Sequence, residues 1–399
     1  MRNQKGYAWK ASGSWYGRWN QNEVVDGVVV RRQHSERLCA ASDKYRNRSD
    51  VQPLLDDRLK DINSARYAPE STGSVATYAE KHFLPYADAE LKPSTRRHYR
   101  AIWNTYLKEQ PQVEDIPLRD FRCVDTTKML AGIHRKHGLS RKSLRHCKGT
   151  LSSLFSHARA AGVIDGINPA TGAKLPRTAE KSVPTHAYTP QEVMDMMSVL
   201  TGVARTAVAL MFFAALRPGE ARGARLRDYD ADRRVLHVRN SMFGTHLTTP
   251  KTEESCGVVP VNNVLANILD GITGSPDRSL LAGPSGKPAD LHNLAARVVV
   301  PALTRCSVCK KAESDHAKAT HEFNRDDSLP KWRGWYALRR GAGTSAYEIA
   351  PMAAKSLLRH KNIATTQQFY VKSVDAAAVN AVDKISALFD NQTASGRPN

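Results

Sequence analysis

The sequence has few features of a membrane or secreted protein. Its longest apolar run, Thr206 to Leu216, is far shorter than the roughly 20 residues needed to span a bilayer. The first residues, Met1 to Gly6, lack the apolar stretch of a secretion signal. Four of the six cysteines show no framework spacing, which argues against a disulfide scaffold. We therefore expect a cytoplasmic protein with reduced thiols and no membrane partner.

Acidic residues are also scarce relative to basic ones. The 399 residues contain 59 Lys and Arg against 39 Asp and Glu, which gives a formal net charge of +20. Such an excess indicates a polyanionic partner, of which nucleic acid is the commonest, although a merely soluble basic protein is the alternative. The length allows two or three domains.

Residues 1–45 are predicted to form a small β-sheet. Asp26-Gly27 separates two valine-rich segments and is typical of a tight hairpin turn, and three tryptophans mark the preceding segments. Arg31 and Arg32 follow on the outgoing strand. The sheet is either a groove-binding module that presents these arginines to DNA or a structural sheet with a tryptophan core, and the sequence leaves both open.

Residues 72–163 have a helical pattern. Apolar residues recur at helical spacing between Ser140 and Ala161, and Arg141, Arg145 and Lys148 form a stripe on another face. A stripe of charge is usually a solvated face, but residues 94–160 contain 14 Lys and Arg against 5 Asp and Glu. The one-sided charge favours contact with DNA.

Two stretches without an apolar repeat are predicted to be linkers. One joins the β region to the helical region, and the other, at residues 164–186, leads to a third region at 187–390. That third region begins with a helix capped by Thr189 and Glu192. It mixes long helices with one β patch, and Lys251 lies in the turn between its strands. The predicted class is therefore mainly α with small β elements (α+β).

A phosphate-binding site is predicted in this third region. Arg217-Pro-Gly-Glu220 stands at a helix junction, where Glu220 can orient the Arg217 guanidinium. Tyr336 and Arg339 are three residues apart, so they share one helix face and can point into one cavity. His360 and Tyr370 follow. Two arginines, a histidine and a tyrosine together are typical of DNA cleavage through a phosphotyrosine.

These segments resemble one family. Leu-Arg-Pro-Gly-Glu at 216–220, Ala-Leu-Arg-Arg at 337–340 and Leu-Leu-Arg-His-x-x-Ile-x-Thr-Thr-Gln-x-x-Tyr at 357–370 resemble the tyrosine recombinases of the phage integrase type. The match in order and spacing extends over roughly 185–390. The preceding helical region resembles the core-binding (SAM-like) domain of that family, and the N-terminal sheet resembles its arm-binding module less specifically.

The resemblance implies a role for each matching residue. Tyr370 would attack the scissile phosphorus and give a 3′-phosphotyrosyl link with a free 5′-hydroxyl. Arg217 and Arg339 would hold the non-bridging oxygens. Lys251 would protonate the leaving 5′-oxygen, and His360 would bind the phosphate or assist proton transfer.

The implied activity is that of a site-specific DNA recombinase, an integrase, that integrates or excises a mobile element as a homo-tetramer on double-stranded DNA attachment sites. Glu220 would support the arginines, and catalysis would need no cofactor. The family usually has His at the position of Tyr336, and a phenol does not serve as a base near neutral pH as an imidazole does. A catalytically impaired DNA-binding protein is therefore one alternative, and a strand-relaxing enzyme like the type IB topoisomerases is another.

A second site is predicted at residues 304–322. Cys306, Cys309, His316 and His321 have the pattern C-x2-C-x6-H-x4-H, which supplies four ligands suited to tetrahedral Zn²⁺. Lys310 and Lys311 could stabilise the thiolates. We expect a structural zinc knuckle inserted before Tyr336, with a loop of incidental Cys and His as the alternative.

Overall fold

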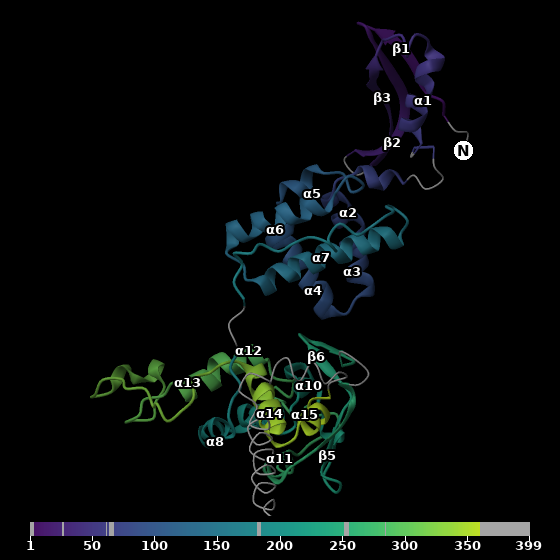
Figure 1. Cartoon of the computed structure of the whole chain (residues 1–399). Coiled ribbons are helices and arrows are strands. Elements are labelled where there is room, and N and C mark those ends of the chain that lie inside the picture. The colour runs from purple at the N-terminus through teal and green to yellow at the C-terminus, as the bar shows by residue number, and fades with distance from the viewer. Residues whose placement is uncertain are drawn as a thin grey trace, which may run out of the picture. The chain divides into compact units, whose positions relative to one another are not determined.

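The computed structural model describes residues 4–25, 28–60, 62–63, 68–181, 185–250, 255–283 and 285–359. Lys251, His360, Tyr370 and the Asp26-Gly27 turn lie outside the described residues. The chain divides into two compact units, Met1–Val183 and Pro184–Asn399, called unit 1 and unit 2 below (Figure 1). No helix among the described residues could cross a membrane.

Unit 1 begins with the expected three-stranded sheet. Its antiparallel strands are adjacent in sequence order: β1 (Tyr7–Ala11), β2 (Ser14–Val25) and β3 (Val28–Ala40). Trp19 and Ala8 are buried against helix α1 (Arg48–Leu59) and contact its Leu55 and Leu59. The sheet thus has a tryptophan core, while Arg31 and Arg32 are exposed on β3.

Helix α1 corrects the sequence prediction, which placed a linker after the sheet. Three apolar residues of α1, Val51, Leu55 and Leu59, are fully buried. They recur at intervals of four residues, so they share one face of the helix. Apart from Pro53 and Leu54, the rest of the helix is polar. The apolar stripe is therefore narrow, and the helical period is hard to recognise in the sequence.

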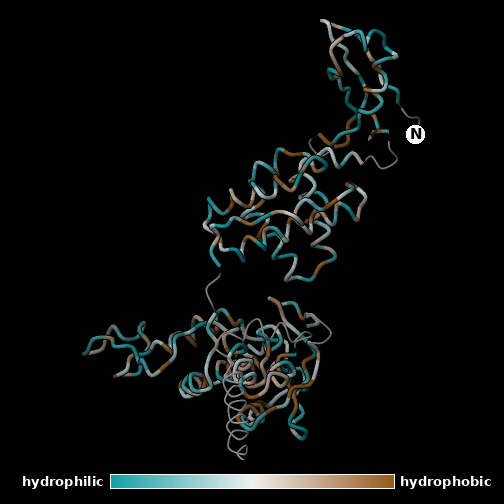
Figure 2. The backbone as a smooth tube through the Cα atoms, in the orientation of Figure 1, coloured by the Kyte–Doolittle hydropathy of each residue, from teal (hydrophilic) through white to brown (hydrophobic). Residues whose placement is uncertain are grey.

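The remainder of unit 1 is helical and surrounds a second core. Its elements are α2 (Val75–Tyr78), the π-helix η2 (Ala79–Phe83), α3 (Leu84–Glu90), α4 (Pro93–Ile102), the π-helix η3 (Trp103–Leu107), α5 (Pro111–Asp115), α6 (Cys123–His137) and α7 (Arg141–Ala160), after the 3-10 turn η1 (Pro69–Thr72). Ser140 caps α7 by accepting from the Ser143 amide. Leu144, Leu151 and Phe155 are buried in this core, as the predicted helical period requires. Hydrophobic and hydrophilic segments alternate along these helices (Figure 2).

The range predicted as an extended linker, 164–186, packs largely against α7. The Asn168 side-chain amide donates to the Ser152 carbonyl at 2.8 Å. The Lys148 ammonium donates to the carbonyls of Thr171 and Ala173 at 3.0 and 2.7 Å. Hydrogen bonds of this kind need no regular spacing of apolar residues. The packing of this segment against α7 was therefore not predicted from the sequence. The boundary between the two units falls at 183–184, near the end of this range.

Unit 2 is mainly helical around one large core. Its helical elements are α8 (Pro190–Val199), α9 (Gly202–Phe213), α10 (Pro218–Gly223), the 3-10 turn η4 (Leu226–Asp228), α11 (Asn263–Leu269), α12 (Leu291–Leu294), the π-helix η6 (Ala295–Val299), α13 (Val300–Leu303), the 3-10 helix η7 (Glu313–Lys318), α14 (Trp335–Ile349) and α15 (Pro351–Leu358). Thr189 and Glu192 cap α8 reciprocally, as predicted. Most of α9 is buried, which explains its long apolar run.

Two small sheets complete unit 2. β4 (Tyr229–Asp230), β5 (Val235–Val238) and β8 (Gly257–Pro260) form an antiparallel sheet, and β6 (Ser241–Phe243) pairs with β7 (His246–Thr248). The pairing of β5 with β8 confirms the predicted β patch. The hairpin β6–β7 was not predicted, because strands of three residues are too short to show alternation.

Two glycines allow close packing of α10 and α14, the helices that carry Glu220 and Arg339. A Cβ on Gly219 in α10 would lie 2.6 Å from the Ser241 hydroxyl, and one on Gly341 in α14 would lie 2.1 Å from the Tyr188 carbonyl oxygen. Neither position accommodates a side chain without movement of its neighbour. These contacts fix α10 against β6 and α14 against the chain entering α8.

Candidate functional site

The Glu220 carboxylate is the centre of a charged cluster in unit 2. Arg217 is the N-cap of α10 and Glu220 its third residue, so the Arg217 amide donates to Glu220 Oε2 at 2.9 Å. The Arg217 guanidinium donates to Glu220 Oε1 at 2.6 Å and to the Ser255 hydroxyl at 3.1 Å. The Arg-Pro-Gly-Glu sequence therefore forms a helix start at which the carboxylate orients the guanidinium, as predicted.

Arg339 reaches the same carboxylate from α14. Its guanidinium is 3.8 Å from Glu220 Oε2, and its side chain is almost fully buried. It donates to the carbonyl of Ala215 and, at 2.5 Å, to that of Leu358. Ala215 has a φ of +46°, a strained value for a residue with a Cβ. The strained loop turns its carbonyl toward the guanidinium and fixes the approach of α14 to the start of α10.

A third arginine belongs to the cluster and was not predicted to have a role. Arg359 follows α15, has a φ of +49°, and donates to Glu220 Oε2 at 2.6 Å. Its side chain is only 6% exposed. The motif predicts a role for the adjacent His360 but none for Arg359. The available signal was a third arginine within the same motif.

The protonation state of Glu220 follows from its surroundings. Burial raises the pKa of this carboxyl, but the charges of Arg359, Arg217 and Arg339 oppose burial and leave the pKa below its ordinary value. For the Arg359 guanidinium, burial lowers the pKa. The charge of Glu220 opposes this shift, and the charge of Arg217 adds to it. The cluster therefore holds an ionised carboxylate among three cations.

The structure does not place Tyr336 in this cluster. Its side chain is 56% exposed on the first turn of α14, and no hydrogen bond among the described residues links it to Glu220 or the arginines. Arg339 is buried against the carbonyls of Ala215 and Leu358 while Tyr336 is exposed, and the expectation that both point into one cavity stays a prediction. Of the predicted site, the described residues bring together Arg217, Arg339 and Glu220.

The predicted DNA-contacting residues of unit 1 differ in their surroundings. Arg145 is exposed on α7, whereas Arg141 is half-buried. The Lys148 ammonium is occupied by two backbone carbonyls. On β3, Arg32 lies 3.5 Å from Glu23 and keeps more than half of its side chain exposed. Arg145, Arg31 and Arg32 are thus the most accessible of the five.

The four predicted metal ligands lie together. Their ligand atoms all fall within 4.8 Å of one another, and His321 Nε2 is 3.3 Å from Cys306 Sγ and 3.2 Å from His316 Nε2. Cys306 is fully buried, and the Val308 amide donates to its sulfur at 3.4 Å. The Cys/His group formed by these four residues could hold a metal ion.

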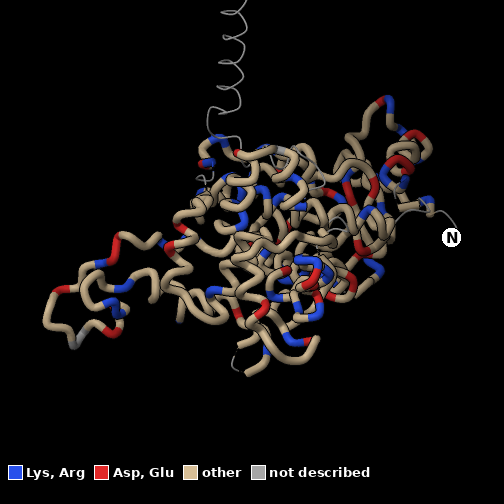
Figure 3. Tube along the Cα trace, turned by 90° about the horizontal axis from the view of Figure 1, so that it is seen from below, with Lys and Arg blue, Asp and Glu red and all other residues tan. Residues whose placement is uncertain are grey.

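The Cys/His group lies in an extension between α13 and α14 that runs out from the rest of unit 2 (Figure 1). Residues 304–329 contain five basic and five acidic residues, and both signs occur along the extension in Figure 3. Lys310 pairs with Asp326 at 3.1 Å, and its role beside the thiolates stays a prediction. The balanced charge gives this extension no electrostatic preference for DNA.

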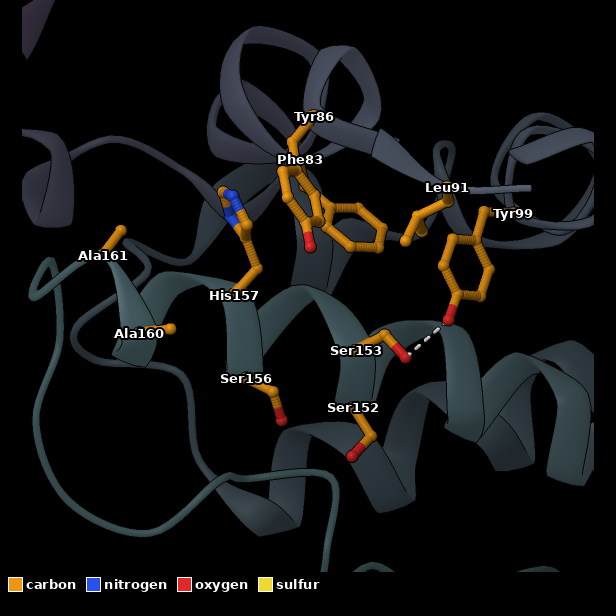
Figure 4. Close-up of a pocket in the computed structure, with 10 residues that line it drawn as sticks. All are labelled: Phe83, Tyr86, Leu91, Tyr99, Ser152, Ser153, Ser156, His157, Ala160 and Ala161. Atoms are coloured by element: carbon orange, nitrogen blue, oxygen red, sulfur yellow. Dashed lines mark hydrogen bonds between the residues drawn. The ribbon is translucent and has the colours of Figure 1, made fainter. Parts of the chain in front are cut away.

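An open pocket of about 580 Å³ lies elsewhere, between α7 and the helices of residues 79–102 (Figure 4). Phe83, Tyr86 and His157 line one side, and the Tyr99 hydroxyl bonds to the Ser153 hydroxyl at 2.9 Å. Burial lowers the pKa of His157, and nearby His82 lowers it further. No Lys or Arg is among the described residues that line the pocket, so these residues do not suit a phosphate.

The comparisons with known proteins concern structure alone, since no family model and no curated protein matches the chain. The structure is similar to the Tn1549 transposon integrase in complex with a circular intermediate DNA, with a TM-score of 0.59, 18% identity, and coverage of 78% of this chain and 99% of that one. It is also similar to a lambda integrase dimer bound to a COC' core site, with a TM-score of 0.52, 18% identity, and coverage of 75% and 96%. Identities this low show a shared fold. The mainly α fold with small sheets is therefore confirmed as that of these integrases.

Proposed function

We propose that this chain, which has the fold of the tyrosine recombinases and integrases, is a site-specific DNA recombinase. It would cleave and rejoin DNA through a 3′-phosphotyrosyl intermediate. The observation that carries the proposal is the pair Arg217 and Arg339, held from α10 and α14 by the single Glu220 carboxylate. Two guanidiniums fixed in this way can bind the non-bridging oxygens of one phosphodiester and stabilise the charge that develops on them. The Arg217 side chain is 24% exposed, which gives a DNA phosphate access to it.

The proposed chemistry conserves the phosphodiester energy. The Tyr370 oxygen forms a bond to phosphorus while the bond from phosphorus to the 5′-oxygen breaks. The tyrosine proton passes to a base, for which we propose His360, and Lys251 protonates the departing 5′-oxygen. Attack by a 5′-hydroxyl of another strand reverses these steps and releases Tyr370. The reaction therefore consumes no nucleotide and needs no cofactor.

We propose double-stranded DNA as the partner and a homo-tetramer as the active assembly. The net charge of +20 and the DNA complexes of the similar integrases support the first point, and a lambda integrase dimer on a core site supports assembly on DNA. Residues 1–45 would bind arm sites, residues 72–163 core sites, and residues 187–390 would carry the chemistry. The product would be an integrated or excised mobile element.

The test uses nicked DNA duplexes with a randomised central stretch, because cleavage beside a nick releases a short fragment and traps the covalent adduct. Parent protein should give an adduct that resists denaturation, and sequencing the trapped DNA should reveal a preferred site. Tyr370→Phe should give none, because phenylalanine lacks the attacking oxygen. The proposal fails if the parent gives no adduct or if Tyr370→Phe gives as much.

The tyrosine at position 336, where the family usually has His, favours a second candidate, a DNA-binding protein of the same fold with impaired turnover. An imidazole can transfer protons near neutral pH and a phenol cannot. Tyr336→His in the same assay separates the two candidates. A large gain in adduct over a barely active parent supports impairment, whereas an already rapid parent rejects it. Relaxation of supercoiled plasmid that lacks the selected site would instead indicate the topoisomerase-like alternative.

We also propose that the Cys/His group holds one structural Zn²⁺. Two thiolates and two imidazoles within 4.8 Å fit tetrahedral coordination, and all four positions would be filled by protein, which excludes a bound substrate. The expected result is about one zinc per chain by elemental analysis, lost in Cys309→Ser and retained in Cys256→Ser, an exposed cysteine outside the group. Stoichiometric zinc in Cys309→Ser, or none in the folded parent, would reject the site.

A further inference from the structure

We propose that Arg359 is a positioning residue of the phosphate site, which neutralises Glu220 and thereby leaves the charge of Arg217 for the DNA phosphate. The inference rests on the proposed recombinase function and assigns a role to a residue that the motif analysis passed over. It concerns charge balance within the four-residue cluster of Arg217, Glu220, Arg339 and Arg359.

The cluster contains more positive than negative charge. Three guanidiniums meet one carboxylate, so three positive charges against one negative leave a formal excess of two. Excess charge in a largely dry site is unfavourable unless an anion joins it. A phosphodiester carries one negative charge and gains a second in its transition state, which matches the excess.

The three arginines differ in accessibility. The side chains of Arg339 and Arg359 are each 6% exposed, whereas that of Arg217 is 24% exposed. Arg217 and Arg359 both lie 2.6 Å from an oxygen of Glu220, and Arg339 lies 3.8 Å away. Arg359 contacts Oε2 and Arg217 contacts Oε1. Of its two closest guanidiniums, the carboxylate therefore has Arg359 as the inner partner and Arg217 as the outer one. The inner partner can stay paired throughout a reaction, while the outer one can share its charge with a ligand.

The backbone beside the inner partner is strained. Arg359 has a φ of +49°, in the left-handed region that residues with a Cβ rarely adopt, and its Nε is buried without an acceptor among the described residues. Strain of this kind persists only where the surroundings enforce it. In this backbone conformation the Arg359 guanidinium contacts Glu220.

Loss of Arg359 should therefore act through Arg217. With the inner partner gone, Glu220 would be paired mainly to Arg217, and the formal excess would fall from two to one. A phosphate would then compete with a carboxylate for the same guanidinium. Removal of the Glu220 charge as well would restore the excess of two, because two guanidiniums would face an uncharged side chain.

The experiment compares Arg359→Ala with the double variant Arg359→Ala/Glu220→Gln. The readouts are the single-turnover rate of adduct formation at saturating DNA and the Kd for the nicked duplex selected with the parent. We expect Arg359→Ala to lower the rate about 10²-fold, as loss of one charge-stabilising donor does, with little change in Kd. The double variant should recover at least about tenfold of that loss, since its charge matches the parent.

Two further variants separate charge from backbone. Arg359→Gly relieves the left-handed φ but removes the guanidinium, so it should be as slow as Arg359→Ala. Arg359→Lys keeps a charge and should retain more of the rate than either. Melting temperatures identify any variant that does not fold. Added guanidinium ion gives a second readout, because it should raise the rate of adduct formation by folded Arg359→Ala.

The outcomes are distinguishable from failure of the proposed function. A parent that forms no adduct rejects the recombinase proposal itself. A parent that forms adduct while Arg359→Ala or Arg359→Gly is equally fast rejects only the role of Arg359. Additive losses in the double variant would also overturn it, because a merely structural contact predicts no rescue by Glu220→Gln.

Discussion

Glu220 connects stability to pH at the scale of a single residue. Its folded-state pKa is lowered from the ordinary 4.5, so its contribution to stability is present above that value and is lost as pH falls through the lower folded pKa. We expect Glu220→Gln to lose about 3 kcal/mol at pH 7, because one partner of a buried ionic cluster is removed. As pH falls from 4.5 towards the lower folded-state pKa, the parent should progressively lose this advantage.

Thermal unfolding of both proteins between pH 7 and pH 3 measures the effect. The matched control is Glu348→Gln, which removes an exposed carboxylate from the same unit. Its melting temperature should follow the parent at every pH. A gap between Glu220→Gln and the parent that does not narrow on acidification would contradict the charged cluster.

Gly341 sets the packing of α14 at the scale of an element. A Cβ there would lie 2.1 Å from the Tyr188 carbonyl, and backbone on both sides prevents an easy shift. Gly341→Ala should therefore destabilise unit 2 by about 1–3 kcal/mol, as overpacking does. Gly149→Ala in α7 meets nothing within 4 Å and should instead stabilise unit 1 by about 0.5–1 kcal/mol. Calorimetry of the two variants checks both signs.

Two neighbouring cations of α7 should behave differently in DNA binding. Arg145 is exposed, so Arg145→Ala should weaken binding and reduce the salt slope by about 1. Lys148 holds the carbonyls of Thr171 and Ala173, so Lys148→Ala should chiefly speed proteolysis of residues 164–181. Binding titrations at several salt concentrations, together with limited proteolysis, separate the two effects. Equal loss of salt slope in both variants would contradict this division.

Elements with a strong repeat or a cap were predictable from sequence. The period of α7, the Thr189 cap and the Arg217 helix start each depend on neighbouring residues, and the structure confirms all three. Helix α1 and the packing of residues 164–181 depend on partners distant in sequence, so local pattern did not indicate them. The role of Arg359 is of the same kind, since its contact with Glu220 spans 139 positions.

Across the whole molecule, net charge makes a prediction about DNA binding. With +20 and exposed arginines in unit 1, we expect several phosphate contacts, and six to ten would give a log–log salt slope of roughly −6 to −10. Fluorescence anisotropy of a labelled duplex at salt concentrations between about 50 and 200 mM measures this slope. A flat response would reject extensive backbone contact.

The wide sequence separation within the Glu220 cluster has a consequence for protein synthesis. Arg217 and Glu220 emerge from the ribosome early, but Arg339 and Arg359 emerge more than a hundred residues later, and the cluster spans residues 217–359. At about 5–20 residues per second, several seconds separate these events. During that interval unit 1 is already complete, so a nascent chain that binds DNA would do so without a finished phosphate site. The arginine cluster would thus be completed only after Arg359 has emerged.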